Sequence, residues 1–171
     1  LKRLKVYCTV WSRDPLADFP FDCAEQVVFV FADQSKFSEA KAMRLPPHVR
    51  LFCSDVCSSV AQEDFFPSRE GPTVELSNGF GTDDLRAFNE KFLFTFSNMT
   101  LKFNGHSLNN DLSFMTSVTK LVVRDMAAGT LTLPSSVVGL YIEYSCHDAT
   151  VMGSEHLTWL KVDWEGVSFT P

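Results

Sequence analysis

Apolar residues return along this chain in a short cadence, apolar-x-x-apolar-x-apolar, with polar stretches of similar length between the copies. Four copies are clear: Leu1/Leu4/Val6, Val118/Leu121/Val123, Val137/Leu140/Ile142 and Leu157/Leu160/Val162. Looser copies lie between them at Val28/Val30, Val49/Leu51, Val74/Leu76 and Leu101/Phe103. Alternating apolar positions are typical of a strand with one buried face. The pattern therefore predicts eight short strands.

The spacing of these copies predicts a repeat protein. The middle apolar residues fall at positions 4, 28, 51, 74, 101, 121, 140 and 160, at intervals of 24, 23, 23, 27, 20, 19 and 20 residues. A repeat of this length cannot bury its apolar face alone, and stacking on its neighbours completes the core. We expect a single domain over residues 1–171 with about eight repeats. Because the chain begins at Leu1 within the pattern, we expect it to be a fragment or a processed form.

The segments between the predicted strands differ along the chain. Residues 33–43 and 82–92 have helical patterns, and in the second Leu85, Phe88 and Phe92 fall on one helical face. Thr82 or Asp83 would cap that helix. Residues 127–136 contain glycine and proline and are predicted to be extended.

The cadence resembles the L-x-x-L-x-L signature of the leucine-rich repeat family, from Leu1 to about Trp164. The approaches LPPHV (45–49) and LPSSV (133–137) look like those of irregular repeats. That family places Asn or Cys three residues after the last apolar position. Here those positions hold Thr9, Asp33, Ser54, Gly79, His106, Met126, Ser145 and Glu165. The resemblance implies an α/β fold without an asparagine ladder: a curved solenoid with a parallel sheet on its concave face and helices or irregular segments on its convex face.

The residues between the inward positions point onto the concave face, because side chains alternate along a strand. Aromatic and arginine side chains on such a face are typical anchors of protein interfaces. The candidate binding residues are Lys5, Tyr7, Phe29, Phe31, Phe52, Glu75, Lys102, Asn104, Arg124, Tyr141, Glu143, Trp159, Lys161 and Asp163. Tyr141, Lys161 and Asp163 are expected to be exposed. Residues 27–32 are apolar on both faces, so the alternative that Phe29 and Phe31 are covered stays open.

Composition narrows the function classes. The net charge is −6, which argues against a nucleic-acid partner, and no apolar run approaches the length of a membrane span. The cysteine count is five, an odd number, and Cys8 and Cys53 fall at inward positions. The glycosylation sequon at Asn98 is too common a pattern to assign a compartment.

The chain contains no convincing catalytic or metal-binding motif. Cys53 and Cys57 lack the further ligands that a zinc site needs, so we expect no metal and no cofactor. Cys146, His147 and Asp148 are adjacent, and adjacent side chains on an extended backbone point apart rather than converging as in a catalytic triad.

We therefore interpret the chain as a non-enzymatic recognition module that binds another protein on its concave sheet face. Two alternatives remain. One is a structural subunit of a larger assembly. The other is a right-handed β-helix that acts on or binds polysaccharide, whose coils would carry two or three strands each.

Overall fold

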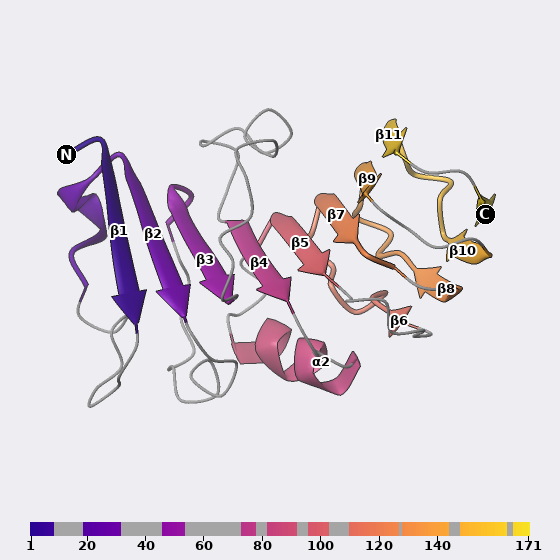
Figure 1. The fold of residues 1–171 in the computed structure, drawn as a ribbon, viewed down its shortest axis with the longest axis horizontal. Helices are drawn as coiled ribbons and strands as arrows, with labels where there is room; N and C mark the ends of the chain where they lie inside the picture. Colours follow the sequence, from indigo (N-terminus) through magenta and orange to yellow (C-terminus); the bar gives the residue numbers. More distant parts are fainter. Residues whose placement is uncertain are drawn as a thin grey trace.

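The computed structural model describes residues 1–8, 19–31, 46–53, 73–77, 82–91, 96–102, 110–126, 128–143, 148–163 and 166–171. Within these residues the backbone winds into a solenoid of parallel strands, with the two ends of the chain at opposite ends of the stack (Figure 1). The predicted solenoid is therefore present.

All eight predicted strands lie side by side in one parallel sheet, which we call sheet A. They follow one another in chain order, as expected for stacked repeats. Their bounds are β1 (Arg3–Cys8), β2 (Gln26–Phe31), β3 (Val49–Cys53), β4 (Thr73–Ser77), β5 (Asn98–Lys102), β7 (Lys120–Arg124), β9 (Gly139–Glu143) and β11 (Trp159–Val162).

Strand pairing defines a row of aligned positions through sheet A, which we call the inner row. Its members are Val6, Phe29, Leu51, Val74, Met99, Leu121, Leu140 and Leu160. Phe29, Met99, Leu121 and Leu140 are buried in the core.

The register predicted from the cadence is correct for β3, β4, β7, β9 and β11 and wrong for the other three. The marker in β1 is Val6 rather than Leu4, and that in β5 is Met99 rather than Leu101. In β2 the inward residues are Val27 and Phe29, whereas the pattern predicted Val28 and Val30. The two faces of this strand are therefore exchanged relative to the prediction.

A second parallel sheet, sheet B, closes the C-terminal coils and lies beside sheet A (Figure 1). It contains β6 (Asn110–Asp111), β8 (Gly129–Thr132), β10 (Ala149–Met152) and β12 (Val167–Thr170). The extended conformation predicted for residues 127–136 is confirmed by β8. The coils in this half therefore carry two strands each, which is the feature expected of the β-helix alternative and not of the leucine-rich-repeat-like solenoid.

Helix is sparse in the part of the chain that the structure describes. It comprises α2 (Thr82–Lys91) and a short 3-10 turn, η1 (Phe21–Cys23). The predicted helix over 82–92 is thus confirmed, and Leu85 is buried as expected. α2 contacts the following coil, since Asn89 Nδ2 donates to the Phe114 carbonyl and the Arg86 guanidinium lies 4.4 Å from the Phe114 ring centroid. The helix predicted over 33–43 lies outside the described residues, so the helical convex layer stays a prediction.

Hydroxyl side chains join the C-terminal coils at the entry to each strand. Thr119 Oγ1 donates to the carbonyl of Ser97, Ser136 Oγ to that of Val118, and Thr158 Oγ1 to that of Val138. Each acceptor belongs to the preceding coil, so the contacts form a serine/threonine ladder in the role that the family pattern gives to asparagine.

Tight turns set the approach to several strands. The N–H of Val49 donates to the carbonyl of Pro46, and the N–H of Val137 to that of Pro134, both at 3.1 Å. These are the two LPxxV segments. Proline fixes its own φ and favours such a turn. The turn therefore sets the position at which Val49 or Val137 enters the core.

Candidate interaction surface on sheet A

The face of sheet A that points away from the core carries several of the predicted binding residues in aligned rows. Pairing places Glu143 beside Arg124 and Lys161 beside Tyr141. Asp163 follows directly after β11, held by its N–H, which donates to the Ile142 carbonyl. Neighbouring strands lie about 4.8 Å apart, so side chains in one row contact one another. We call Arg124, Tyr141, Glu143, Trp159, Lys161 and Asp163 the C-terminal outer face.

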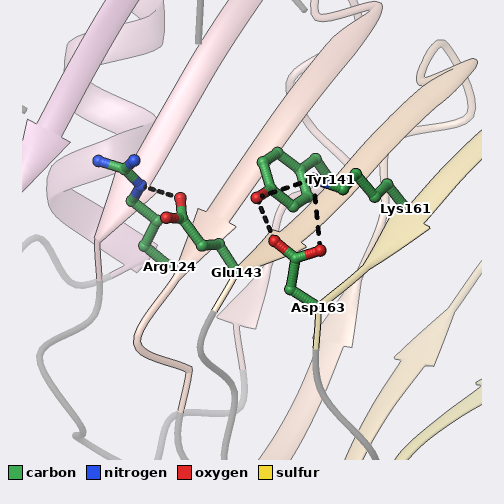
Figure 2. A network of polar contacts seen from close by, with 5 residues as sticks. All are labelled: Arg124, Tyr141, Glu143, Lys161 and Asp163. Carbon is green, nitrogen blue, oxygen red and sulfur yellow. Dashed lines mark hydrogen bonds and ion pairs between the residues drawn. The ribbon is translucent and has the colours of Figure 1, made fainter. Parts of the chain in front are cut away.

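Arg124 and Glu143 form an ion pair across β7 and β9 (Figure 2). The Nε–Oε2 distance is 2.5 Å, and the two side chains are only 9% and 14% exposed. A charge-assisted hydrogen bond of this kind is stronger than a neutral one, and partial burial shields it from salt. The pair fixes both side chains in one geometry.

Tyr141, Lys161 and Asp163 form a second network across β9 and β11 (Figure 2). The Tyr141 hydroxyl donates to Asp163 Oδ2. Lys161 Nζ lies 3.3 Å from the Tyr141 hydroxyl oxygen and 3.3 Å from Asp163 Oδ1. The same ammonium lies 4.3 Å from the Tyr141 ring centroid, within cation–π range. Each of the three groups therefore contacts the other two.

This network shifts the protonation equilibria of its members. Burial raises the pKa of Tyr141, and the hydrogen bond to Asp163 raises it further. The hydrogen bond with Tyr141 raises the pKa of Lys161. The hydrogen bond from Tyr141 lowers the pKa of Asp163. All three pKa shifts favour the same charge state at neutral pH, in which the Tyr141 phenol is neutral, Lys161 is an ammonium and Asp163 is a carboxylate.

Among the candidates whose side chains the structure describes, five are exposed. Lys5 and Tyr7 are exposed on β1, and Trp159, Lys161 and Asp163 are exposed at the other end of sheet A. Trp159 is 43% exposed. These five lie on β1, on β11 or, in the case of Asp163, directly after β11.

Tyr141 is only 9% exposed, so its predicted exposure is wrong. Its ring packs on Val122, which is itself buried although it points away from the main core. Arg124 is buried on the same face. Asn98 and Thr100 in β5 are also buried, so the middle of the outer face is not an open surface. A glycan on Asn98 is incompatible with this position in the folded chain.

Phe29 does not belong to the outer face. It is fully buried, and its ring packs at 4.8 Å and 6.1 Å, centroid to centroid, against Phe19 and Phe21. The alternative that Phe29 is covered is correct, because the register of β2 turns this residue toward the core. Pairing also aligns Phe31 with Cys8 and Cys53, the two cysteines predicted to face inward.

The remaining candidates divide into two groups. Pairing puts Phe52 and Glu75 in the outer row of Lys161, and Lys102 in that of Arg124, with the side chains outside the described part. Asn104 lies outside the described residues altogether.

No helix among the described residues is long and apolar enough to cross a membrane. They also hold no group of three or more His, Cys, Asp or Glu side chains placed to bind a metal ion.

Comparison of the chain with protein-family models, with curated proteins and with solved structures finds no match. The leucine-rich repeat family therefore stays a resemblance of sequence pattern.

Proposed function

We propose that this chain is a recognition module that binds a partner protein on the C-terminal outer face of sheet A. The observation that carries the proposal is the exposed Trp159 beside the ordered network of Tyr141, Lys161 and Asp163. Tryptophan is enriched among residues that dominate interface energetics, and charged groups beside it confer specificity.

Preorganisation supports this assignment. Association costs free energy when rotamer-rich side chains are immobilised, about 0.5–1.5 kcal/mol for each. Lys161 is already held by two oxygen atoms and an aromatic ring, and Glu143 by Arg124. A partner that contacts this face therefore meets charges whose positions are set before binding.

The burial of Tyr141 makes it unsuitable for a binding test. Tyr141→Ala would remove core-like packing on Val122, so a loss of binding could not be separated from a loss of folding. Trp159 and Lys161 are both exposed, which makes Trp159→Ala/Lys161→Glu the better test. Met152, exposed on β10 of sheet B, supplies a matched control, Met152→Ala.

The experiment compares proteins retained from the native source by the wild-type chain, by the double variant and by the control. We expect one protein retained by the wild type and by Met152→Ala, and at least about tenfold less of it on the double variant, as for the loss of a central anchor. Thermal unfolding checks that the variants remain folded. Equal retention on all three chains overturns the proposal.

Polysaccharide binding is the second candidate. Each C-terminal coil carries one strand in each sheet, β7 and β8 in one coil and β9 and β10 in the next, and this favours polysaccharide binding because two or more strands per coil were the expected feature of a β-helix. Trp159 offers an exposed ring for a sugar to contact. Calorimetric titration with soluble polysaccharides tests it: saturable heat that disappears in Trp159→Ala supports this candidate, and no heat from any of them counts against it.

A further inference from the structure

The Tyr141 side chain lies between two charged groups of the C-terminal outer face and contacts both (Figure 2). Its hydroxyl donates to Asp163 Oδ2, and its ring centroid lies 4.3 Å from Lys161 Nζ. A rotation of the ring would move the hydroxyl away from the carboxylate and the ring face away from the ammonium. The positions of Lys161 and Asp163 therefore depend on the contacts that hold the ring.

Val122 packs on this ring from the interior of sheet A. Strand pairing places it beside Tyr141, in an outer row that runs through Thr100, Val122, Tyr141 and Lys161. Val122 is fully buried, and with Tyr141 it forms an apolar cluster that is separate from the main core. No third buried apolar residue of the described part belongs to this cluster.

The neighbours of Tyr141 along its own strand give no comparable packing. Side chains two residues apart share a face of a strand, and in β9 these positions are Gly139 and Glu143. Gly139 has no side chain, and Glu143 is bound to Arg124 on the neighbouring strand. Removing the methyl groups of Val122 would therefore open other staggered rotamers to the ring, because its dispersion contacts on that side are lost.

We propose that Val122 is a positioning residue of the C-terminal outer face, which holds the Tyr141 ring and through it places Lys161 and Asp163 for the partner protein. This inference rests on the proposed function, because it assigns Val122 a role at the same surface. Val122 is fully buried, so it acts through Tyr141 and not by contact with the partner. A residue two strands away from Lys161 then controls the strength of binding.

Two adjacent valines of β7 provide a matched comparison. Val122 and Val123 are both fully buried, but Val122 packs on Tyr141 whereas Val123 belongs to the main core. Val122→Ala and Val123→Ala remove the same methyl groups from the two faces of one strand. Val122→Thr keeps the branched shape of the side chain and should leave the ring in place. Circular dichroism confirms that each variant is folded.

Nuclear magnetic resonance measures the arrangement without any partner. An aromatic ring shields protons above its face, so the methylene protons beside Lys161 Nζ should resonate upfield in the wild type. The hydrogen bond from Tyr141 lowers the pKa of Asp163, which a carboxyl titration measures. In Val122→Ala we expect the shielding to decrease and the pKa of Asp163 to rise toward its ordinary value. Val123→Ala and Val122→Thr should match the wild type in both measurements.

Binding is measured with the protein that the wild-type chain retains. Val122→Ala should bind it about tenfold more weakly, a difference of about 1.4 kcal/mol, because two charged side chains must then be ordered on binding. Val123→Ala and Val122→Thr should bind it as the wild type does.

Three results overturn the inference. The first is a Val122→Ala variant in which the shielding and the pKa of Asp163 are unchanged. The second is an equal change of both quantities in Val123→Ala, which would show a general loosening of the fold. The third is equal binding by Val122→Ala and the wild type although the shielding and the pKa have changed. A wild-type chain that retains no protein refutes the proposed function instead, while the resonance measurements still decide whether Val122 holds the arrangement.

Discussion

Leu140 and Leu160 occupy the same row of sheet A in adjacent strands but differ in burial, and this contrast gives a quantitative prediction. Leu140 is fully buried and Leu160 is 46% exposed. Replacing a buried leucine by alanine costs the transfer free energy of the lost methyl groups and an additional term for the cavity, about 2–5 kcal/mol together. At Leu160 about half of the side chain is already hydrated, and water fills the space that is left. Full burial of a leucine is worth about 1.5–3 kcal/mol, so the cost there should be about 1 kcal/mol.

Urea unfolding followed by far-ultraviolet circular dichroism measures both costs. It is done at concentrations where sedimentation finds monomers, so that association does not contribute to the stability. The midpoint should fall much further for Leu140→Ala than for Leu160→Ala, with the slope m unchanged in both. A cost below about 1.5 kcal/mol for Leu140→Ala would refute its place in the core. Equal costs for the two variants would refute the inner row as the structure defines it.

Three further predictions concern the polar networks and the backbone. The pKa of Asp163 is lowered in the folded chain, so this carboxylate contributes stability that is present above its unfolded pKa of about 3.9 and is lost as the pH falls through the lowered folded value. Tyr141→Phe removes the hydrogen bond that is the main cause, so unfolding midpoints between about pH 5 and pH 2 should depend less on pH than in the wild type. Glu143→Ala leaves the Arg124 guanidinium buried without its carboxylate and should cost about 3–5 kcal/mol in urea unfolding, whereas the double replacement Arg124→Met/Glu143→Leu should cost clearly less; equal losses would contradict a buried pair. Gly153 has φ of 78°, and an added Cβ would lie 3.4 Å from the Leu133 carbonyl oxygen. Gly153→Ala should therefore cost about 1–2 kcal/mol, and an unchanged midpoint would contradict the left-handed conformation.

The alternation of apolar residues was enough to find the strands of sheet A but not always their register. The inward residues of β7, β9 and β11 were predicted correctly from the spacing of the pattern, although Val122 in β7 and Tyr141 in β9 stand between inward positions and are themselves buried. β2 has the sequence QVVFVF, which is apolar at five consecutive positions. A shift by one residue exchanges the two faces of a strand, and such a run gives no polar side to decide between them. Only pairing with β1 and β3 assigns Phe29 to the core.

A shift of two residues is harder still to detect, because it leaves every side chain on the same face of the strand. Leu4, Val6 and Cys8 alternate evenly along β1, and any of them fits the middle of the cadence. Val6 stands in the row of Leu160 because the pairing of successive strands places it there. Leu4 and Leu160, which hold the same position in the sequence pattern, are therefore offset by two residues in the sheet.

The candidate surface was predicted in part. Lys5, Tyr7, Trp159, Lys161 and Asp163 are exposed as an alternating strand requires, while Arg124 and Tyr141 point to the same face and are buried. Burial on that face depends on contacts between neighbouring side chains, such as the Tyr141 ring on Val122, which no single strand specifies. The serine/threonine ladder did have a signal in the sequence, namely hydroxyl residues just before β7, β9 and β11.

The sequence by itself determined the repeat: eight apolar cadences at nearly constant spacing, each too short to bury its face alone, require stacking into a parallel solenoid. It also determined α2, through apolar residues at helical spacing after the cap candidates Thr82 and Asp83. Tertiary structure alone decided the register of β1 and β2, the second sheet and the burial of Tyr141. These features depend on which residues of neighbouring coils become aligned, and alignment is a property of pairs of strands, whereas the periodicity of a sequence describes each strand separately.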